Sequence, residues 1–95
     1  MEKLYYTIKE VSEITGLPPS TLRYWEKVFP ELRPVRTSKG RRRYRKKDIE
    51  MVEKIKNLLH NQGYTIEGAR KKLKKKTLIE EIIKELEEIK KILGG

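Results

Sequence analysis

Four closely spaced prolines constrain what this chain can fold into: Pro18, Pro19, Pro30 and Pro34. Proline lacks a backbone N–H and its ring clashes with the preceding helical turn, so none of them suits the interior of a helix. The first position of a helix, however, tolerates proline well, which suits Pro19. The sequence therefore predicts a short helix over residues 19–28, which ends before Pro30.

Another short helix is predicted just before it, over residues 8–15. Thr7 and Glu10 match a capping box, in which each side chain bonds to the backbone of the other residue. The apolar positions then follow helical spacing: Ile8, Val11 and Ile14. Gly16 is suited to ending the helix, because glycine readily adopts the left-handed conformation. Two short helices joined by a turn of roughly three or four residues predict a helix-turn-helix.

The helix over residues 19–28 has two different faces. Leu22, Trp25 and Phe29 form an apolar stripe, which we assign to the core rather than to base stacking. The other face offers hydroxyl groups, a guanidinium and an ammonium, which are the donors that contact base edges and phosphates. The candidate DNA contacts on this helix are Ser20, Thr21, Arg23, Tyr24 and Lys27. For Tyr24, half-burial against the segment that follows is the alternative.

Positive charge is concentrated in the first four fifths of the chain. The net charge is +10, and residues 1–77 alone have +12, whereas residues 78–95 have −2. Residues 33–47 contain nine bases and no acid, and residues 70–76 contain six bases in seven positions. Localised positive charge is typical of a polyanion-binding surface. For residues 70–76, a solvated lysine-rich face is an equally open interpretation.

The segment after the two short helices predicts an arginine-rich β-hairpin. Leu32–Arg36 would form one arm and Arg41–Arg45 the other, and Gly40 at the tip can adopt a positive φ. We expect Val35 and Tyr44 to contact the rest of the domain. A hairpin directly after a helix-turn-helix is a wing, whose arginines suit phosphate oxygens or a narrow minor groove; a flexible solvated loop is the alternative. The candidate DNA contacts of the wing are Arg36, Lys39, Arg41, Arg42, Arg43, Tyr44 and Arg45.

Two further helices are predicted after the hairpin, over residues 47–62 and 66–76. The apolar face of the first consists of Ile49, Val52, Ile55, Leu58 and Leu59. Thr65 caps the second, which contains Gly68 at a cost of about 1 kcal/mol relative to alanine, so we expect close packing there. His60, the single histidine, is assigned to the surface or to helix capping rather than to a ligand site.

The last predicted helix, residues 77–95, has a different pattern. Thr77 and Glu80 form a second possible capping box. Apolar residues then recur at alternating steps of three and four, which is the pattern of a short coiled coil. The candidate dimer contacts are Leu78, Ile79, Ile82, Ile83, Leu86, Ile89 and Leu93, with Ile92 beside them. Because the lysine-rich residues 70–76 separate this stripe from the core, we expect it to pair with a second chain rather than to fold back.

Composition argues against several classes of function. The chain has no cysteine and one histidine, which leaves little material for a disulfide framework, a metal site or a catalytic triad. No carboxylate pair or phosphate-cradling loop is recognisable, so we expect no enzyme activity and no cofactor. No apolar run approaches the roughly 20 residues of a membrane span, and no signal peptide is recognisable. An RNA-binding module would need stacked aromatics on a sheet or a GXXG loop, and the sequence has neither.

Three linked segments carry a family resemblance: YYTIKEVSEITGLPPSTLRYWEKVF, GRRRYRKKDIEMVEKIKNLL and GYTIEGARKKL. Together they resemble the DNA-binding domain of the MerR family of bacterial transcription regulators, over residues 5–76. The resemblance implies a winged helix-turn-helix that dimerises through a C-terminal antiparallel coiled coil. It also implies binding to a pseudo-palindromic promoter element, often with bending. Many members have a ligand-binding domain or metal-binding cysteines after the coiled coil; neither follows here, so we expect a chain without a separate effector domain.

We therefore expect a mainly α fold: a winged helix-turn-helix with a small β-hairpin wing at residues 1–76, then a short coiled-coil dimerisation helix at residues 77–95. The expected function is sequence-specific regulation of transcription by a homodimer. The alternative is an architectural, chromosome-organising or recombination accessory protein with low sequence specificity. The expected partners are double-stranded DNA, a second copy of the chain and, at a promoter, RNA polymerase. The expected location is the bacterial cytoplasm, at the nucleoid and away from membranes.

Overall fold

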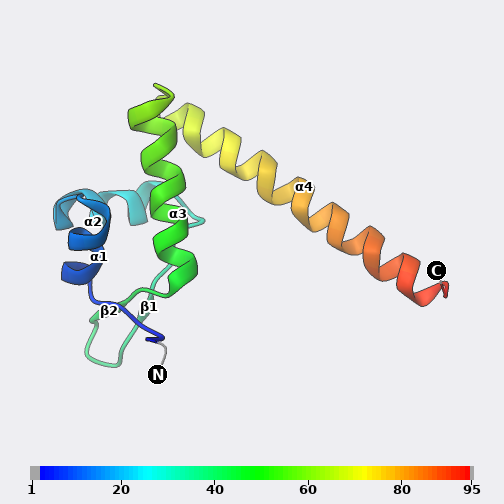
Figure 1. Cartoon of the computed structure of the whole chain (residues 1–95), viewed down its shortest axis with the longest axis horizontal. Coiled ribbons are helices and arrows are strands. Elements are labelled where there is room, and N and C mark those ends of the chain that lie inside the picture. Colours follow the sequence, from blue (N-terminus) through cyan, green and yellow to red (C-terminus); the bar gives the residue numbers. More distant parts are fainter. Residues whose placement is uncertain (1–2, 95) are drawn as a thin grey trace.

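The computed structural model describes residues 3–94 and is mainly helical, with one small antiparallel hairpin. In chain order the elements are α1 (Ile8–Thr15), α2 (Pro19–Val28), β1 (Val35–Arg36), β2 (Arg42–Arg43), α3 (Lys46–Lys56), the π-helical turn η1 (Asn57–Asn61) and α4 (Ile66–Ile92). Figure 1 shows α1, α2 and the hairpin gathered beside α3, while α4 projects away from them. The predicted winged helix-turn-helix is confirmed.

Helices α1 and α2 have the predicted bounds, and local signals explain both of them. Thr7 Oγ1 accepts a hydrogen bond from the backbone of Glu10 (3.2 Å), and the Glu10 carboxylate accepts one from the backbone of Thr7 (3.0 Å), which completes the capping box. Gly16 ends α1 at φ 75°, a left-handed conformation that costs other residues energy. Pro19 occupies the first turn of α2, as predicted.

The core lies between α1, α2, α3 and the first turns of α4. Its apolar members are Val11, Leu17, Leu22, Trp25, Phe29, Leu32, Tyr44, Val52, Ile55, Leu58, Ala69 and Leu73. The stripe that was assigned to the core on α2 is buried as predicted, with Trp25 only 3% exposed. Trp25 and Phe29 meet edge to face, at 6.3 Å between ring centroids.

Ile14 follows the helical spacing of Ile8 and Val11 but does not face the core, because its side chain is 55% exposed. Val11 and Thr15, one turn apart, are buried instead. Lys56 of α3 donates a hydrogen bond from Nζ to the carbonyl oxygen of Thr15 at 2.6 Å. The C-terminal end of α1 therefore lies against α3, and Ile14 is on the solvent side.

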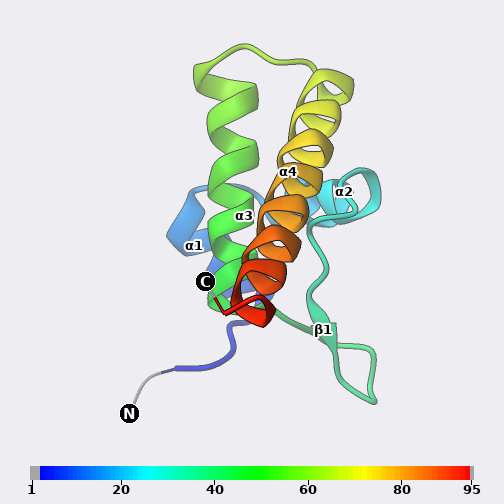
Figure 2. The same ribbon diagram turned by 90° about the vertical axis from the view of Figure 1, so that its right-hand side faces the viewer.

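The hairpin is shorter than the two predicted five-residue arms. Only two residue pairs form, Val35 opposite Arg43 and Arg36 opposite Arg42. The tip closes through the backbone of Thr37 and Arg41 (2.9 Å), and Gly40 has a φ of 77°. Figure 2 shows the hairpin extending beyond the helices.

Contacts at the base of the hairpin differ in part from the prediction. Tyr44 contacts the domain as expected, is fully buried, and exchanges two 2.8 Å backbone hydrogen bonds with Tyr6. Val35, which was also expected to contact the domain, is 41% exposed. Leu32, at 1% exposure, is buried in its place. Pro34 cannot donate to a strand partner, which favours pairing that begins only after it.

The predicted helix at residues 47–62 begins one residue earlier, at Lys46, and changes at Asn57 into the π-helical turn η1.

The expected close packing at Gly68 is confirmed, since a Cβ there would lie 3.1 Å from Thr65 Oγ1, the group that caps α4.

The predicted break between residues 76 and 77 is wrong, because α4 runs without interruption from Ile66 to Ile92. Thr77 does not cap a new helix; its Oγ1 donates to the carbonyl oxygen of Leu73 at 3.0 Å. Continuing a formed helix adds one backbone hydrogen bond per residue, whereas a new start leaves the first N–H groups without partners. After Leu73 every described residue of α4 is exposed. Within residues 3–94, no helix is long and apolar enough to cross a membrane.

Candidate nucleic-acid interface

Helix α2 presents a polar face opposite the buried Leu22 and Trp25. The predicted contacts Ser20, Arg23, Tyr24 and Lys27 are exposed, and Thr21 is partly exposed. Tyr24 is 52% exposed, which agrees with the alternative of half-burial and leaves half of the side chain accessible. The face therefore combines hydroxyl, guanidinium and ammonium donors at helical spacing.

The wing adds a second set of cations. Lys39 and Arg41 at the tip are exposed, and the Arg36 side chain is 53% exposed. Arg43 is partly exposed, and its guanidinium donates only a long 3.4 Å hydrogen bond to the neighbouring Arg42 carbonyl. Lys39, Arg41 and Arg43 keep their donors largely available to a partner, whereas the half-exposed Arg36 also pairs with an acid of α2.

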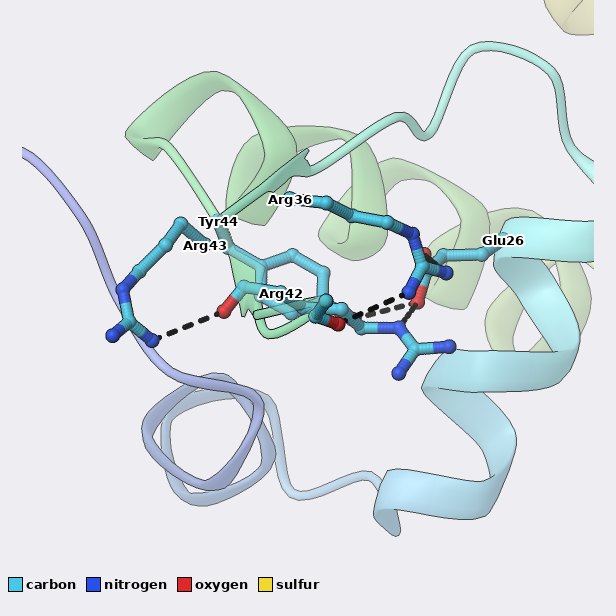
Figure 3. A network of polar contacts seen from close by, with 6 residues as sticks. Glu26, Arg36, Arg42, Arg43 and Tyr44 are labelled. Atoms are coloured by element: carbon cyan, nitrogen blue, oxygen red, sulfur yellow. Dashed lines mark hydrogen bonds and ion pairs between the residues drawn. The ribbon is translucent and has the colours of Figure 1, made fainter. Parts of the chain in front are cut away.

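Arg42 lies differently from its neighbours, because it is bound to Glu26 of α2 (Figure 3). Arg42 Nε donates to Glu26 Oε2, and the Arg36 guanidinium lies 3.7 Å from Oε1 of the same carboxylate. The Glu26 side chain is only 10% exposed, so little water screens these ion pairs. Figure 3 shows Arg43 extending away from this cluster.

The inclusion of Tyr44 among the DNA contacts is corrected, because its side chain is fully buried. Its hydroxyl donates to Glu26 Oε2 at 3.0 Å. Burial, and next to it the negative charge of Glu26, raise the pKa of the Tyr44 hydroxyl above its ordinary value of 10.0, which keeps this donor protonated. Tyr44 therefore supports the wing from inside the domain.

Arg45 also has partners within the chain. Its guanidinium donates to the carboxylate of Asp48 (3.1 Å) and to the carbonyl oxygen of Arg33 (2.9 Å). Asp48 is 2% exposed and also accepts from the backbone N–H of Arg45 at 2.8 Å, which secures the first turn of α3. Arg42 thus links β2 to α2, and Arg45 secures the start of α3, so neither of them is a free cation.

Sequence reasoning missed Glu26 as part of this site. Glu26 is the single acid of α2 and comes shortly before an acid-free, nine-base segment. An isolated acid beside many arginines is a usable signal, because an excess of positive charge favours an ion pair with any carboxylate that can reach it. The sequence could not tell which arginines would reach it.

The basic stretch at residues 70–76 lies on α4, mostly in solvent. Leu73 is its one buried residue, and Lys71 forms a 3.4 Å surface ion pair with Glu67. Lys72 lies over the ring of Tyr64, with Nζ 4.9 Å from the ring centroid. The stretch is therefore a solvated face whose lysines remain available to an anion.

The apolar residues of the distal part of α4 are all exposed. We call this set the α4 stripe: Leu78, Ile79, Ile82, Ile83, Leu86, Ile89, Ile92 and Leu93, at 47–82% exposure. The stripe does not fold back on the core, in line with the prediction.

The single histidine lies at the surface, as expected. His60 is exposed, with its ring edge against Trp25 at 6.3 Å between centroids. Among the residues that the structure describes, no group of three or more His, Asp or Glu side chains is arranged to hold a metal ion.

Comparison with known proteins identifies relatives of this chain. It is 38% identical over 56 residues to the HTH-type transcriptional regulator MlrA of Escherichia coli (strain K12), a match that covers 59% of this chain and 23% of MlrA. It is 33% identical over 79 residues to the uncharacterized HTH-type transcriptional regulator YyaN of Bacillus subtilis (strain 168), covering 83% of this chain and 56% of YyaN. The chain thus spans about a quarter to somewhat over half of these relatives.

A solved structure has the same fold. The crystal structure of HiNmlR, a MerR family regulator lacking the sensor domain, bound to promoter DNA, matches with a TM-score of 0.67 and 24% identity. The match covers 90% of this chain and 70% of HiNmlR. The family model described as "MerR HTH family regulatory protein" matches residues 6–76, which include both helices of the helix-turn-helix, the wing and the start of α4. This chain therefore belongs to the MerR HTH family of regulatory proteins.

Proposed function

We propose that this protein is a double-stranded DNA-binding transcription regulator of the MerR type, which acts as a dimer on a pseudo-palindromic promoter element. The observation that carries the proposal is the junction at Glu26: the exposed donors of α2 and the cations of the wing belong to two elements that meet through one carboxylate. One part of the domain therefore offers both kinds of DNA contact at once. Family membership supports a regulatory role rather than an enzymatic one.

In this proposal α2 enters the major groove. Its exposed side chains mix donors and acceptors that can meet base edges and the phosphates beside them. Arg23 is the best candidate for reading sequence, because a guanidinium can bond to guanine through two donors. Ser20, Thr21, Tyr24 and Lys27 would fix the register of the helix.

The wing would hold the DNA backbone. Lys39, Arg41 and Arg43 are the cations with available donors, and phosphate oxygens or a narrow minor groove accept them without regard to sequence. Arg36 is half exposed and shares its charge between Glu26 and the DNA. Arg42 would contribute mainly through its bond to Glu26.

We propose that the α4 stripe pairs two chains. Eight large apolar side chains in solvent are unfavourable on a domain of this size, and a second copy offers the same stripe. One α2 and one wing span only half of a pseudo-palindrome, so a dimer joins two half-site contacts into one operator-length contact. A promoter-binding dimer would also meet RNA polymerase, which we propose as a partner. We propose the cytoplasm as its location.

An architectural or recombination accessory protein is the second candidate, and the charge favours it: +12 over residues 1–77 attracts any DNA. The two candidates differ in how strongly they prefer one sequence. We would select bound fragments from a pool of random duplexes and compare their affinity with that of the unselected pool. A regulator should prefer its site by a factor of about 10³ or more. Selection without enrichment would reject the regulator and leave the architectural role.

Alanine at Arg41 and at Arg43 should weaken binding to every duplex to a similar extent. Each change removes one phosphate contact in each half-site, so for the dimer the slope of log affinity against log salt should fall by about two. The measurement is DNA affinity over a salt series, and Lys84→Ala, far along α4, is the matched loss of charge. Slopes that stay unchanged in both variants would exclude the wing from the phosphate contacts.

Arg23→Ala should reduce affinity for the selected site by about 1–3 kcal/mol per half-site and relax the preference at one base position in each half-site. The reason is loss of a two-donor contact to a base edge. Repeating the selection with the variant measures the preference directly. An equal loss of affinity on selected and random duplexes would make Arg23 a phosphate contact instead.

A further inference from the structure

The wing contains an unfavourable pair of charges within its own sheet. Arg36 and Arg42 lie directly opposite each other on β1 and β2, so both side chains point to the same face of the hairpin. Like charges in this position destabilise a strand pair. The hairpin has only one other residue pair, and such a short ribbon is marginal in water. An external partner must therefore stabilise it.

Glu26 supplies that partner from α2. Its carboxylate accepts from Arg42 Nε, lies 3.7 Å from the Arg36 guanidinium and accepts from the Tyr44 hydroxyl at 3.0 Å. One side chain thus reaches both strands and the buried residue at the base of β2 (Figure 3). Since Glu26 is only 10% exposed, the hydrogen bonds that it accepts from Arg42 and Tyr44 are stronger than surface ion pairs.

We propose that Glu26 is a positioning residue that clamps the wing to α2 and so fixes the angle at which the two elements meet DNA. The inference rests on the proposed function, because fixing this angle affects DNA binding only if the wing and α2 contact the same duplex. Binding is tighter when both contacts are already in place, since less conformational freedom is lost. The clamp also has an electrostatic cost, because it keeps an anion beside two wing cations.

Glu26→Gln separates these two effects, because it preserves the shape of the side chain and removes its charge. Affinity for a duplex selected from the random pool should fall by about ten-fold, the order expected for losing a charge-assisted hydrogen bond. Affinity for a random duplex of the same length should stay equal or increase, with a steeper salt dependence, because two guanidinium groups are released and one negative charge is lost. A variant that merely unfolds would lose affinity for both.

Two controls make the result specific. Glu13→Gln, on the exposed side of α1, removes the same charge outside the clamp and should leave the ratio of selected to random affinity unchanged. The double variant Glu26→Gln/Arg42→Gln should lose little more selectivity than Glu26→Gln alone, because residues that act through one contact are not additive.

A measurement without DNA tests the clamp itself. In a ¹H–¹⁵N spectrum, Arg42 Nε–H should exchange slowly with water in the wild type and rapidly in Glu26→Gln. The backbone order parameters at residues 37–41 should fall in the same variant. If Glu26→Gln behaves like Glu13→Gln on both duplexes, or leaves the Arg42 signal unchanged, the inference is overturned. If the wild type binds neither duplex, the proposed function has failed and the positioning role fails with it, even where the Arg42 signal still reports the contact.

Discussion

Leu86→Glu should produce a folded monomer that has lost most of its affinity for an operator-length duplex. Leu86 lies at the centre of the α4 stripe and is 59% exposed in the single chain, well beyond Leu73, the last buried residue of α4. The carboxylate of the new glutamate would be buried in the dimer but would remain in water in the monomer. Truncating a packed leucine to alanine costs about 2–5 kcal/mol, and a buried unpaired charge costs more. Loss of the second half-site should reduce affinity by about 10²–10⁴-fold.

Sedimentation equilibrium at micromolar concentration measures the change in mass, and circular dichroism verifies that the variant stays folded. Lys84→Glu is the matched control, because it introduces the same side chain two residues away, on the opposite side of the helix. We expect this control to dimerise. A wild-type chain that is monomeric in solution and binds one copy per site would contradict the pairing proposal.

Trp25→Ala should have the largest effect on stability. The side chain is 3% exposed and packs edge to face against Phe29, with His60 on another side. Removing a buried tryptophan costs about 3–5 kcal/mol. The total stability of a domain is only about 5–15 kcal/mol, so much of the helix-turn-helix should unfold at moderate temperature.

The neighbouring Tyr24→Ala separates core from surface on the same helix. Tyr24 is 52% exposed, so its loss should change stability by less than about 0.5 kcal/mol while weakening DNA binding. Urea unfolding followed by circular dichroism compares the two variants without depending on tryptophan fluorescence. Equal midpoints for Trp25→Ala and wild type would contradict the assignment of Trp25 to the core.

Local chemistry was sufficient to predict the first two helices to the residue. The capping box at Thr7, the left-handed Gly16 and the position of Pro19 each act within one turn of the backbone. A residue's own φ preference and its hydrogen bonds to near neighbours do not depend on the rest of the fold, so these bounds can be read directly. The same reasoning failed at Thr77, because an identical capping signal can be overridden by a helix that already extends through it.

The basic composition of the candidate site was predicted, but not which of its residues bind within the chain and which stay available to DNA. Nine bases without an acid indicated a polyanion-binding wing, and the family match supports that interpretation. Which arginines remain available was not predictable. Arg42 finds a partner sixteen positions earlier in the chain, and Arg45 reaches a carbonyl twelve positions earlier. Those contacts depend on how the hairpin packs against α2 and α3.

The sequence by itself determined where helices α1 and α2 begin and end, that an arginine-rich hairpin follows them, and that an apolar stripe runs along the last helix. Only the tertiary structure decided that Ile14 faces solvent, that Tyr44 lies inside the domain, and that Glu26 binds both strands of the wing. The physical reason is range. Dihedral preferences and capping bonds act between near neighbours, whereas burial and ion pairing depend on the angles at which whole elements pack. Those angles are set by the shared core. Several segments build that core together, so no single segment of the sequence reveals the angles.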